Sequence, residues 1–508
     1  TLTVLRDGKI IRTFEKAEFE AGAIRASMIG RELQGDYYRS DFQASSQPEV
    51  ALDVRNLVYE DRLKGISFQV HKGEIVGIGG LAHCGMHSLG KVCFGALKPE
   101  EGSVTVEDGT IIDSPAIAMK KRVGYVSKDR DVESLCLNAS IEDNISIAGM
   151  SEFAINNFLI LKNREKKYVN HQIEELSIKC AGRDQSVSQL SGGNKQKVVF
   201  GKWIGCGSEI LILDCPTRGV DIGVKQAMYQ LMVRLKNEGK SILMISEELP
   251  ELIGMSDRIL IMKNGEVSAE FERSETLSDA QIIERKRNGQ ICLIQKIQIM
   301  ALRIQTKIKT KNKKMMISAL PFVALVVLLA VFCGIVSSKG YRLDMYIKIV
   351  FNEGIVLSIV ATGAIFIYTL GSFDISLGAA TLFAATLGVL TYNATENFAL
   401  MIIVILLAGI VCSLVNSVLA SIFHIPVFVT TVAMMSVLSA IASQIITTKG
   451  GAVGGISIPS EVVKHLDNSA FKIGVLVIWV AICVFVFDYT KFGRREKFVG
   501  GNPICAQL

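Results

Sequence analysis

The 508-residue chain contains eleven cysteines and six histidines, but neither residue type occurs in a metal-binding pattern. No two cysteines have the C-x-x-C spacing, and no H-E-x-x-H sequence is present. The cysteines are scattered, several of them in apolar stretches, which is typical of reduced thiols in a cytosolic or membrane protein. No signal peptide is recognisable at the start of the sequence. These absences argue against a disulfide-rich secreted protein and against a zinc protein.

One stretch of the chain lacks acidic residues altogether. Residues 285–314 contain no aspartate or glutamate, are rich in lysine and arginine, and directly precede a long apolar run. Under the positive-inside rule this pattern predicts a cytoplasmic segment next to a membrane, although a solvated basic linker is the alternative. The net charge of +6 therefore does not indicate nucleic acid, and we expect no nucleic-acid partner.

The hydrophobic residues, which make up 49% of the chain, are unevenly distributed. The first 314 residues are mixed and polar, whereas most of the remainder is apolar and predicts contact with membrane lipid. Six runs are long enough to cross a bilayer of about 30 Å, at 318–338, 349–371, 375–392, 398–422, 425–447 and 472–489. An even number of spans places the basic stretch and residues 491–497 in the cytoplasm, and the loop 450–472 outside.

Two motifs lie close together in the first half. Residues 190–198, LSGGNKQKV, place serine and glycine at the start of a basic helix, where free backbone N–H groups bind anions. Residues 211–223, LILDCPTRGVDIG, predict an apolar strand that ends at Asp214. An acid at the carboxyl end of a buried parallel strand lies where open α/β sheets bind ligands. The pair of motifs predicts an α/β domain with a phosphate site.

These motifs resemble the signature loop and the Walker B strand of an ATP-binding-cassette (ABC) ATPase. The resemblance implies an α/β P-loop ATPase domain followed by an all-α multi-pass transmembrane domain, with ATP and Mg²⁺ as cofactors. Asp214 would support the Mg²⁺, and Asp221 would lie in the D-loop. The signature residues would act in trans on nucleotide bound to a partner cassette; they are Leu190, Ser191, Gly192, Gly193 and Asn194.

The expected nucleotide-binding loop keeps its glycines but not its charged and hydroxyl side chains. Gly80 and Gly85 have the spacing of G-x-x-x-x-G-K-[ST] after a predicted strand. In that motif the lysine reaches the phosphates and the hydroxyl residue binds Mg²⁺, whereas this chain has Met86 and His87. The backbone can still cradle phosphate, and Ser88 could replace the missing hydroxyl only if the register slips.

Two further positions depart from the resemblance. Cys215 stands where the family carries its catalytic glutamate, and Glu247 aligns with the switch histidine after the predicted strand 241–245. A thiol cannot polarise water as a carboxylate does, and a carboxylate at the switch position would repel the γ-phosphate. Replacements in three separate motifs predict a degenerate hydrolytic site. The alternative is three neutral substitutions in a working enzyme.

Further segments of the first half resemble one group within the family. GLAHCG at 80–85, YVSKDR at 125–130 and ISEELPEL at 245–252 are similar to the second cassette of bacterial monosaccharide importers of the ribose and galactoside type. Ser127 and Lys128 depart from the usual proline and acid in the loop that faces the permease.

The apolar half resembles the permease subunit of the same importers. The segments GSFDISLG at 371–378, IPVFV at 425–429 and FVGGNPICAQL at 498–508 are similar to permease motifs, the last of them in a cytoplasmic helix. Asp374 is an acid within an apolar region. It is either a residue of the transport path or the N-cap of the following helix, and both interpretations stay open.

The start of the chain repeats a later segment. Residues 2–10 and 259–267 each predict a hairpin around an Asp-Gly or Asn-Gly turn. The family context makes the first copy the remnant of an earlier cassette, although a chance hairpin is the alternative. The predicted domains are a cassette remnant at 1–35, a linker at 36–49, a second nucleotide-binding domain at 50–285, a basic linker at 286–315 and a partial permease at 316–508.

The resemblance implies ATP-driven import of a small sugar across the bacterial inner membrane, with the ATPase domain in the cytoplasm. The expected partners are an intact first cassette, a second permease subunit and a periplasmic or surface-tethered sugar-binding protein. An exporter-type half transporter and a non-hydrolysing regulatory or vestigial protein are the alternatives. Because the signature is intact and the P-loop is not, we expect Ser191→Arg to be more damaging than Gly85→Ala.

Overall fold

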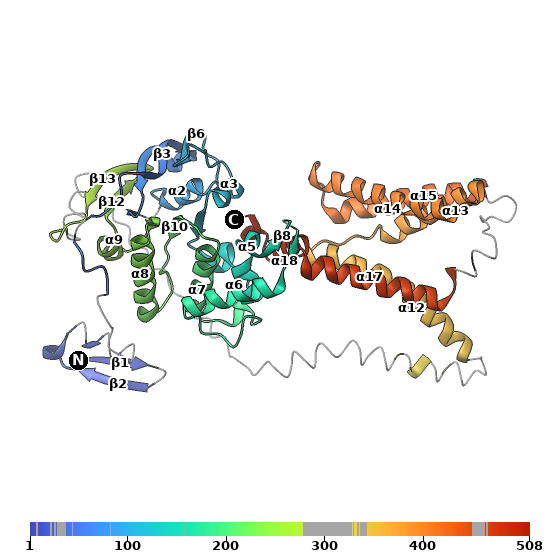
Figure 1. Cartoon of the computed structure of the whole chain (residues 1–508), viewed down its shortest axis with the longest axis horizontal. Helices are drawn as coiled ribbons and strands as arrows, with labels where there is room; N and C mark the ends of the chain where they lie inside the picture. Colours follow the sequence, from blue (N-terminus) through green and yellow to red (C-terminus); the bar gives the residue numbers. More distant parts are fainter. Residues whose placement is uncertain are drawn as a thin grey trace. The chain divides into compact units, whose positions relative to one another are not determined.

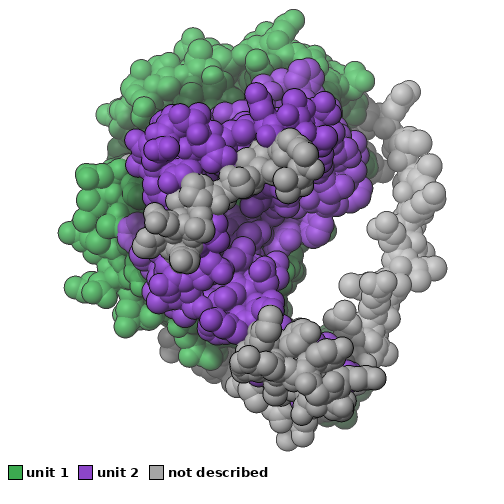
Figure 2. All heavy atoms as spheres, turned by 90° about the vertical axis from the view of Figure 1, so that its right-hand side faces the viewer, with its two compact units in different colours: residues 1–290, 486–508 green, residues 291–485 purple. Residues whose placement is uncertain are grey.

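The computed structural model describes residues 1–6, 9–20, 37–277 without 43, 82 and 157, 343–449 and 466–507, with isolated residues at 23, 24, 27, 328, 330–332, 335 and 463. The chain divides into two units. Residues 1–290 together with 486–508 form one unit, and residues 291–485 form the other (Figure 2). The first unit is built of strands and helices, and the second of helices.

A six-stranded sheet forms the centre of the first unit, in the order β13-β12-β5-β11-β10-β7. The strands are β5 (Ile75–Gly80), β7 (Val123–Val126), β10 (Ile210–Asp214), β11 (Ser241–Ile245), β12 (Arg258–Lys263) and β13 (Glu266–Glu272). All pair in parallel except β13, which is antiparallel to β12. Every residue of β7, β10 and β11 is buried, which explains why these strands are short continuous apolar runs.

A second, antiparallel sheet has the order β4-β3-β6, with β3 at Val50–Tyr59, β4 at Leu63–His71 and β6 at Glu101–Val106. In the second half of β4 the residues alternate between buried and exposed, because one face of this sheet packs on the core and the other faces solvent. The turn between β3 and β4 brings Arg62 close to the loop that follows β5.

Helices cover the central sheet. They are α2 (Met86–Cys93), α3 (Pro115–Lys120), α4 (Ile141–Ser146), α5 (Met150–Phe153), α6 (Lys162–Glu175), α7 (Gly192–Gly205), α8 (Ile222–Asn237) and α9 (Leu249–Met255). Helix α2 contacts β10 and β11, and α7 contacts β7 and lies beside α4 and α6 (Figure 1). Trp203 of α7 joins the core, where its ring centroid lies 5.6 Å from that of Phe94. Packing of α7 therefore fixes the position of its first turn.

The predicted repeat appears as two hairpins with the same internal pairing. In the first, β1 (Leu2–Arg6) pairs with β2 (Lys9–Phe14), and Leu2 lies opposite Phe14. In the second, Ile259 of β12 lies opposite Phe271 of β13. Counted from these two pairs, three successive positions are paired in each hairpin before the register shifts. The shift falls between Val4 and Leu5 in the first hairpin and between Ile261 and Met262 in the second. The shared bulge supports a common origin, and the assignment of the first copy to an earlier cassette stays a prediction.

The helical unit contains long apolar helices. They are α12 (Leu343–Thr369), α13 (Leu377–Thr395), α14 (Phe398–Ser421), α15 (Val427–Lys449) and α17 (Ser469–Tyr489). Among the described residues, these five are long and apolar enough to cross a membrane. They correspond to five of the six predicted spans. Most of the remaining one, predicted at 318–338, lies outside the described residues.

The last residues of the chain pack on the α/β unit. Helix α18 (Lys491–Gly501) is capped by Thr490, whose hydroxyl accepts a hydrogen bond from the backbone N–H of Gly493. A short helix, α19 (Pro503–Gln507), follows it. Both helices contact the α/β unit around residues 130–165.

Candidate functional site

The carboxyl ends of three parallel strands meet at one edge of the central sheet. Asp214, the last residue of β10, is in register with Ile245 of β11, which in turn pairs with Ile78 of β5. The loop after β5 leads into α2, so the first turn of α2 lies at the same edge. This is the edge at which parallel α/β sheets bind ligands.

The glycines of the loop after β5 are required by the backbone. Gly85 adopts a φ of +97° at the N-cap of α2, and a Cβ there would overlap the carbonyl oxygen of Arg62. A Cβ at Gly80 would lie 2.7 Å from the carbonyl oxygen of Met262. The P-loop-like backbone is therefore present. Gly85→Ala, which we expected to be mild, would instead force the backbone to move.

Met86 belongs to the core and not to the phosphate end of the loop. Its side chain is 1% exposed and joins the main hydrophobic cluster of the α/β unit. It supplies neither charge nor hydrogen bond at the position where the motif carries lysine.

The side chains at the strand ends form a closed hydrogen-bonded network. His87 Nδ1 lies 2.7 Å from Asp214 Oδ1, and its Nε2 lies 2.9 Å from Lys128 Nζ and 3.4 Å from Glu247 Oε1. Lys128 Nζ also donates to Glu247 Oε1 at 2.6 Å, and the Tyr125 hydroxyl donates to Asp214 Oδ2 at 3.4 Å. The hydrogen bond from Lys128 lowers the pKa of Glu247 below its usual value, so this carboxylate is ionised at neutral pH.

Sequence reasoning identified three members of this network, His87, Asp214 and Glu247, and missed the roles of Tyr125 and Lys128. The sequence showed only that Lys128 departs from the acid usual at its position. The signal that could have revealed its role is charge complementarity, because a lysine in this loop compensates the carboxylate at Glu247.

Cys215 follows Asp214 at the end of β10 and points into the same region. It is 7% exposed and adopts a left-handed backbone with φ of +49°. Burial, followed by the charges of Asp214 and Glu247, raises the pKa of its thiol to about 12. The thiol is therefore protonated at neutral pH and cannot act as a general base.

The side chains at this edge do not fit a magnesium–triphosphate group. Mg²⁺ prefers oxygen ligands, whereas the position of the hydroxyl ligand carries an imidazole. The ammonium nearest the site, that of Lys128, is already paired with Glu247 at 2.6 Å. The exposed carboxylate of Glu247 adds negative charge where the phosphates would add more.

The signature residues lie at the start of α7. Ser191 is the N-cap of the helix, and its hydroxyl accepts from the Asn194 backbone N–H at 3.5 Å and from Asn194 Nδ2 at 3.0 Å. Ser191 is exposed, and Leu190 is buried beneath it. Gly193 packs against Val224 of α8, where a Cβ would lie 2.7 Å from a methyl carbon. The N-terminus of α7 therefore faces solvent at Ser191 and is held in place by the packing of Gly193 on α8. An anion-binding site requires both features.

Arg130 and Asp221 support the signature loop from neighbouring elements. Arg130 Nη1 donates to the carbonyl oxygen of Arg218 at 2.7 Å, and its Nη2 lies close to Gly192. Asp221, the predicted D-loop residue, caps α8 by accepting from the Val224 N–H at 3.0 Å. The sequence motifs did not single out Arg130 for this contact, because its partners are carbonyl groups distant in sequence.

Comparison with known protein families agrees with this geometry. A family model described as "ABC transporter" matches residues 63–218, and one described as "Branched-chain amino acid transport system / permease component" matches residues 346–508. One part of the chain is thus similar to the ATPase domain of ABC transporters, and a later part is similar to a transport-system permease component. With its apolar helices, the chain is a multi-pass membrane protein, and the ATPase domain of this family is cytoplasmic.

Several curated relatives are ribose import ATP-binding proteins named RbsA. The protein of Clostridium tetani is 37% identical over 279 residues, which is 55% of either chain. That of Streptococcus agalactiae is 40% identical over 275 residues, 54% of this chain and 55% of the relative. That of Bacillus subtilis is 38% identical over 279 residues, 55% of this chain and 56% of the relative. The chain thus spans little more than half the length of these relatives.

Among solved structures, the chain is similar to a nucleotide-free ATP-binding cassette from an ABC transporter. The sequence identity is 23%, the TM-score is 0.39, and the match covers 47% of this chain and 98% of the cassette.

Helix α18 of the permease domain docks on the helical part of the cassette. Arg494 Nη2 donates to Glu165 Oε1 of α6 at 2.6 Å, and Arg494 also pairs with Asp143 of α4. Arg494 and Glu165 are buried, and burial raises the pKa of Glu165 and lowers that of Arg494, so each charge requires its partner. Asn502 Nδ2 donates to the carbonyl oxygens of Val132 and Leu135 at 2.8 and 2.9 Å.

Asp374 lies just before α13. Its Oδ1 accepts from the backbone N–H of Ser376 at 2.7 Å and from the Ser376 hydroxyl at 2.6 Å, and Asn416 Nδ2 donates to that hydroxyl at 2.9 Å. These contacts form a turn before α13, and because the N-cap of that helix is Ser376, the prediction of Asp374 as the N-cap is wrong. A role for Asp374 in a transport path stays a prediction.

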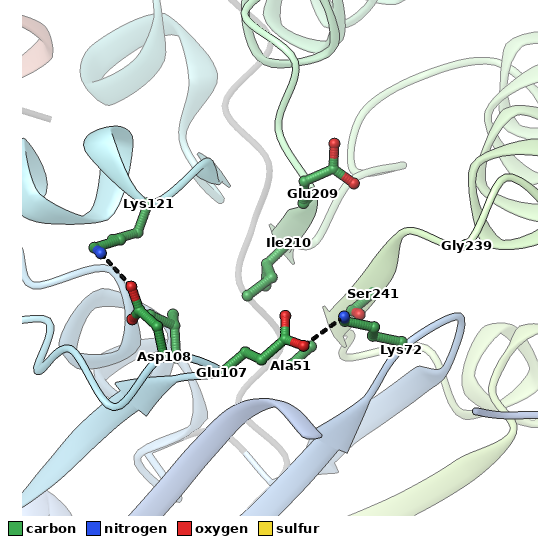
Figure 3. A pocket seen from close by; sticks show the side chains of 10 residues that line it. Ala51, Lys72, Glu107, Asp108, Lys121, Glu209, Ile210, Gly239 and Ser241 are labelled. Atoms are coloured by element: carbon green, nitrogen blue, oxygen red, sulfur yellow. Dashed lines mark hydrogen bonds and ion pairs between the residues drawn. The ribbon is translucent and has the colours of Figure 1, made fainter. Parts of the chain in front are cut away.

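A surface pocket of about 440 Å³ lies at the opposite edge of the sheet, next to the amino ends of β10 and β11 (Figure 3). Its lining residues are paired with one another, Lys72 with Glu107 at 2.7 Å and Lys121 with Asp108. Because parallel α/β sheets bind ligands at their carboxyl ends, we assign it no part in nucleotide chemistry.

Proposed function

We propose that this chain is part of an ATP-driven ABC importer for a small sugar, and that its own nucleotide site contributes little hydrolysis. The relatives named for ribose import support the sugar class, and the permease domain supports transport. ATP would be hydrolysed on an intact first cassette, with which this cassette pairs. A second permease subunit and an external sugar-binding protein would complete the assembly.

The observation that carries the proposal is the network at the strand ends. Asp214, the residue that would support Mg²⁺, is hydrogen-bonded to His87, and Lys128 is paired with Glu247. Met86 is buried and Cys215 is protonated, so neither a phosphate-binding cation nor a general base is available among these residues. This arrangement supports a cassette that does not turn over its own nucleotide.

The signature loop supports the complementary role. Ser191 is exposed at the N-cap of α7, and the backbone N–H groups of half-buried Gly192 and buried Gly193 belong to the first turn behind it. In the proposed importer they hydrogen-bond the γ-phosphate of ATP held by the P-loop of the first cassette, where the helix end favours negative charge. Closure of the two cassettes would then pull on α18 through Arg494, which couples hydrolysis to the permease.

The experiment is to measure ATP turnover by the purified full chain, alone and after reconstitution with an intact first cassette and a sugar-binding protein. The proposal requires negligible turnover by the chain alone, and turnover with ATP-dependent ribose uptake in the assembly. Turnover by the chain alone would exclude the degenerate site, whereas turnover without uptake would exclude the sugar importer.

A second candidate is a non-hydrolysing regulatory ABC protein, which the internally paired network also favours. It would bind an intact cassette through its signature loop and yet support no transport. Reconstitution distinguishes the two, because the regulatory protein would change the partner's ATP turnover without any sugar entering the vesicles.

A further inference from the structure

Three side chains at the end of β10 and the start of α2 converge on one point. One ligand atom from each of His87, Asp214 and Cys215 lies within 4.8 Å of the other two. The three residues come from two sequence segments that are more than 120 positions apart, and only the fold brings them together. Within the described part of the chain, no other group of three such side chains has this geometry.

We propose that His87, Asp214 and Cys215 form a binding site for a divalent transition-metal ion of the Zn²⁺ class. The set offers one nitrogen, one oxygen and one sulfur ligand, which suits Zn²⁺ and excludes Mg²⁺ and Ca²⁺ because those ions select oxygen. Three protein ligands leave one position of a tetrahedral ion for water. This proposal is independent of the sugar and of the role of the signature loop.

The three ligands stand on rigid elements. Asp214 and Cys215 are 1% and 7% exposed at the end of a fully buried strand, and His87 lies in the first turn of α2, which packs on the same strand. The side chain of His87 is 29% exposed, so an ion can enter from solvent past the imidazole. The second oxygen of Asp214 is held by the Tyr125 hydroxyl, which leaves Oδ1 for the metal.

The groups around the ligands have the arrangement of an outer coordination shell. Metal-bound histidines usually donate their second ring N–H to a carboxylate, which orients the ring and raises its basicity. Here Nδ1 faces Asp214, and Nε2 faces Glu247 Oε1 at 3.4 Å. Lys128 holds the same oxygen of that carboxylate at 2.6 Å and lies 2.9 Å from Nε2.

Metal binding changes the proton positions in a balanced way. In the metal-free network the His87 proton serves the Nδ1···Asp214 hydrogen bond, and Nε2 accepts from Lys128. With the ion on Nδ1, the ring proton would be carried on Nε2 and donated to Glu247, and Lys128, which could then no longer donate to that nitrogen, would bond to Glu247 alone. The Cys215 thiol becomes a thiolate, and one proton per bound ion is released to solvent.

The test uses the full-length chain, freed of metal with a chelator, and Co²⁺ as a spectroscopic probe. We expect one Co²⁺ to bind at this site with a tetrahedral d–d spectrum and a thiolate-to-cobalt charge-transfer band, and Zn²⁺ to displace it. Cys215→Ser should remove the charge-transfer band of this site. His87→Asn should weaken Co²⁺ binding by more than ~100-fold, because losing a ligand costs more than the ~10–100-fold typical of losing a group that only orients a ligand.

Matched substitutions control for the other thiols and imidazoles. Cys206→Ser removes a half-buried thiol on α7, and His83→Asn removes an exposed imidazole from the loop before α2. Asparagine tolerates the left-handed backbone of His83, whose φ is +68°. Both controls should bind Co²⁺ as the unmodified chain does.

The proposal is overturned if the unmodified chain gives no thiolate–cobalt band, or if that band survives Cys215→Ser. It is also overturned if Cys206→Ser removes the band. If His87→Asn does not fold, Glu247→Gln provides a second test. It changes the carboxylate that faces the His87 ring and leaves the three proposed ligands in place. It should weaken binding by ~10–100-fold, and unchanged affinity in that variant would contradict the proposed role of the ring.

Discussion

Two corners of one cassette differ in how their polar groups are paired. At the catalytic corner, formed by Met86, His87, Asp214, Cys215 and Glu247, the ionisable side chains bond to one another and to Lys128. At the signature corner, formed by residues 190–194, the helix end is capped only by its own Ser191 and faces solvent. The first corner is internally satisfied, and the second is ready for a ligand.

The loop keeps the backbone of a P-loop, whereas we propose that the side chains around it no longer serve nucleotide hydrolysis. Gly85 keeps the left-handed conformation of a P-loop because the adjacent strand turn leaves no room for a Cβ. The polar side chains of the motifs are under no such steric constraint. The lysine, the hydroxyl residue and the carboxylate can therefore be replaced while the loop keeps its conformation. The conformation of a glycine-rich loop is therefore weak support for catalysis.

The largest expected effect concerns ATP turnover at the catalytic corner. The purified chain should hydrolyse ATP negligibly, because it lacks the phosphate-binding cation and the carboxylate, groups worth about 10²–10⁴-fold each in rate. A phosphate-release assay on the full chain checks this. Turnover near ~1 s⁻¹ that is lost on Asp214→Ala would show that the corner is active.

The next effect concerns the docking of α18 on the helical part of the cassette. Arg494→Ala removes the cation of Asp143 and leaves Glu165 with Lys162 alone, at 3.3 Å, and breaking a buried pair typically costs about 3–5 kcal/mol. We expect a lower midpoint for unfolding of the cassette and loss of transport. Arg495→Ala, at the exposed neighbouring position, is the matched control. Equal effects of the two variants would show that the ion pair does not hold α18 in place.

A smaller effect is expected from the backbone of the catalytic corner. Gly85→Ala places a Cβ against the Arg62 carbonyl at a left-handed φ, and such strain costs roughly 1–3 kcal/mol. Gly182→Ala has open space around it and should leave the stability unchanged. Chemical denaturation of both variants measures the difference. If Gly85→Ala is as stable as Gly182→Ala, the loop is less constrained than its contacts indicate.

The smallest effect concerns the paired surface pocket at the other edge of the sheet. The hydrogen bond from Lys121 lowers the pKa of Asp108 to about 2. Because the folded pKa is depressed, the contribution to stability is present above the ordinary aspartate pKa and is lost as the pH falls toward 2. The pair is exposed, so Lys121→Ala should not measurably change the melting temperature at pH 7. A clear drop there would mean that this pocket is structurally important.

The sequence predicted the strands at the centre of the fold because they are short apolar runs next to glycine-rich turns. It placed five membrane spans within a few residues, since length and hydropathy determine them. The replacements that it indicates at the catalytic corner stay a prediction. The sequence did not predict the pairing of Lys128 with Glu247, nor that His87, Asp214 and Cys215 converge, because these contacts join segments far apart in sequence.

The sequence also did not predict the contact between Arg494 and Glu165, because neither residue lies in a motif that indicates its partner. For this pair, burial made the difference. A charged side chain in a loop or an amphipathic helix is usually exposed, and only the fold shows that these two are buried and must be paired.

The most direct measurement compares the two signature loops of an importer reconstituted with an intact first cassette. One preparation carries Ser191→Arg in this chain, and the other carries the equivalent serine-to-arginine change in the first cassette. Because only the first cassette's nucleotide site is active in our account, Ser191→Arg should abolish ATP turnover and uptake, while the other change should leave both largely intact. Equal loss from the two changes, with normal expression and assembly, would contradict the asymmetry.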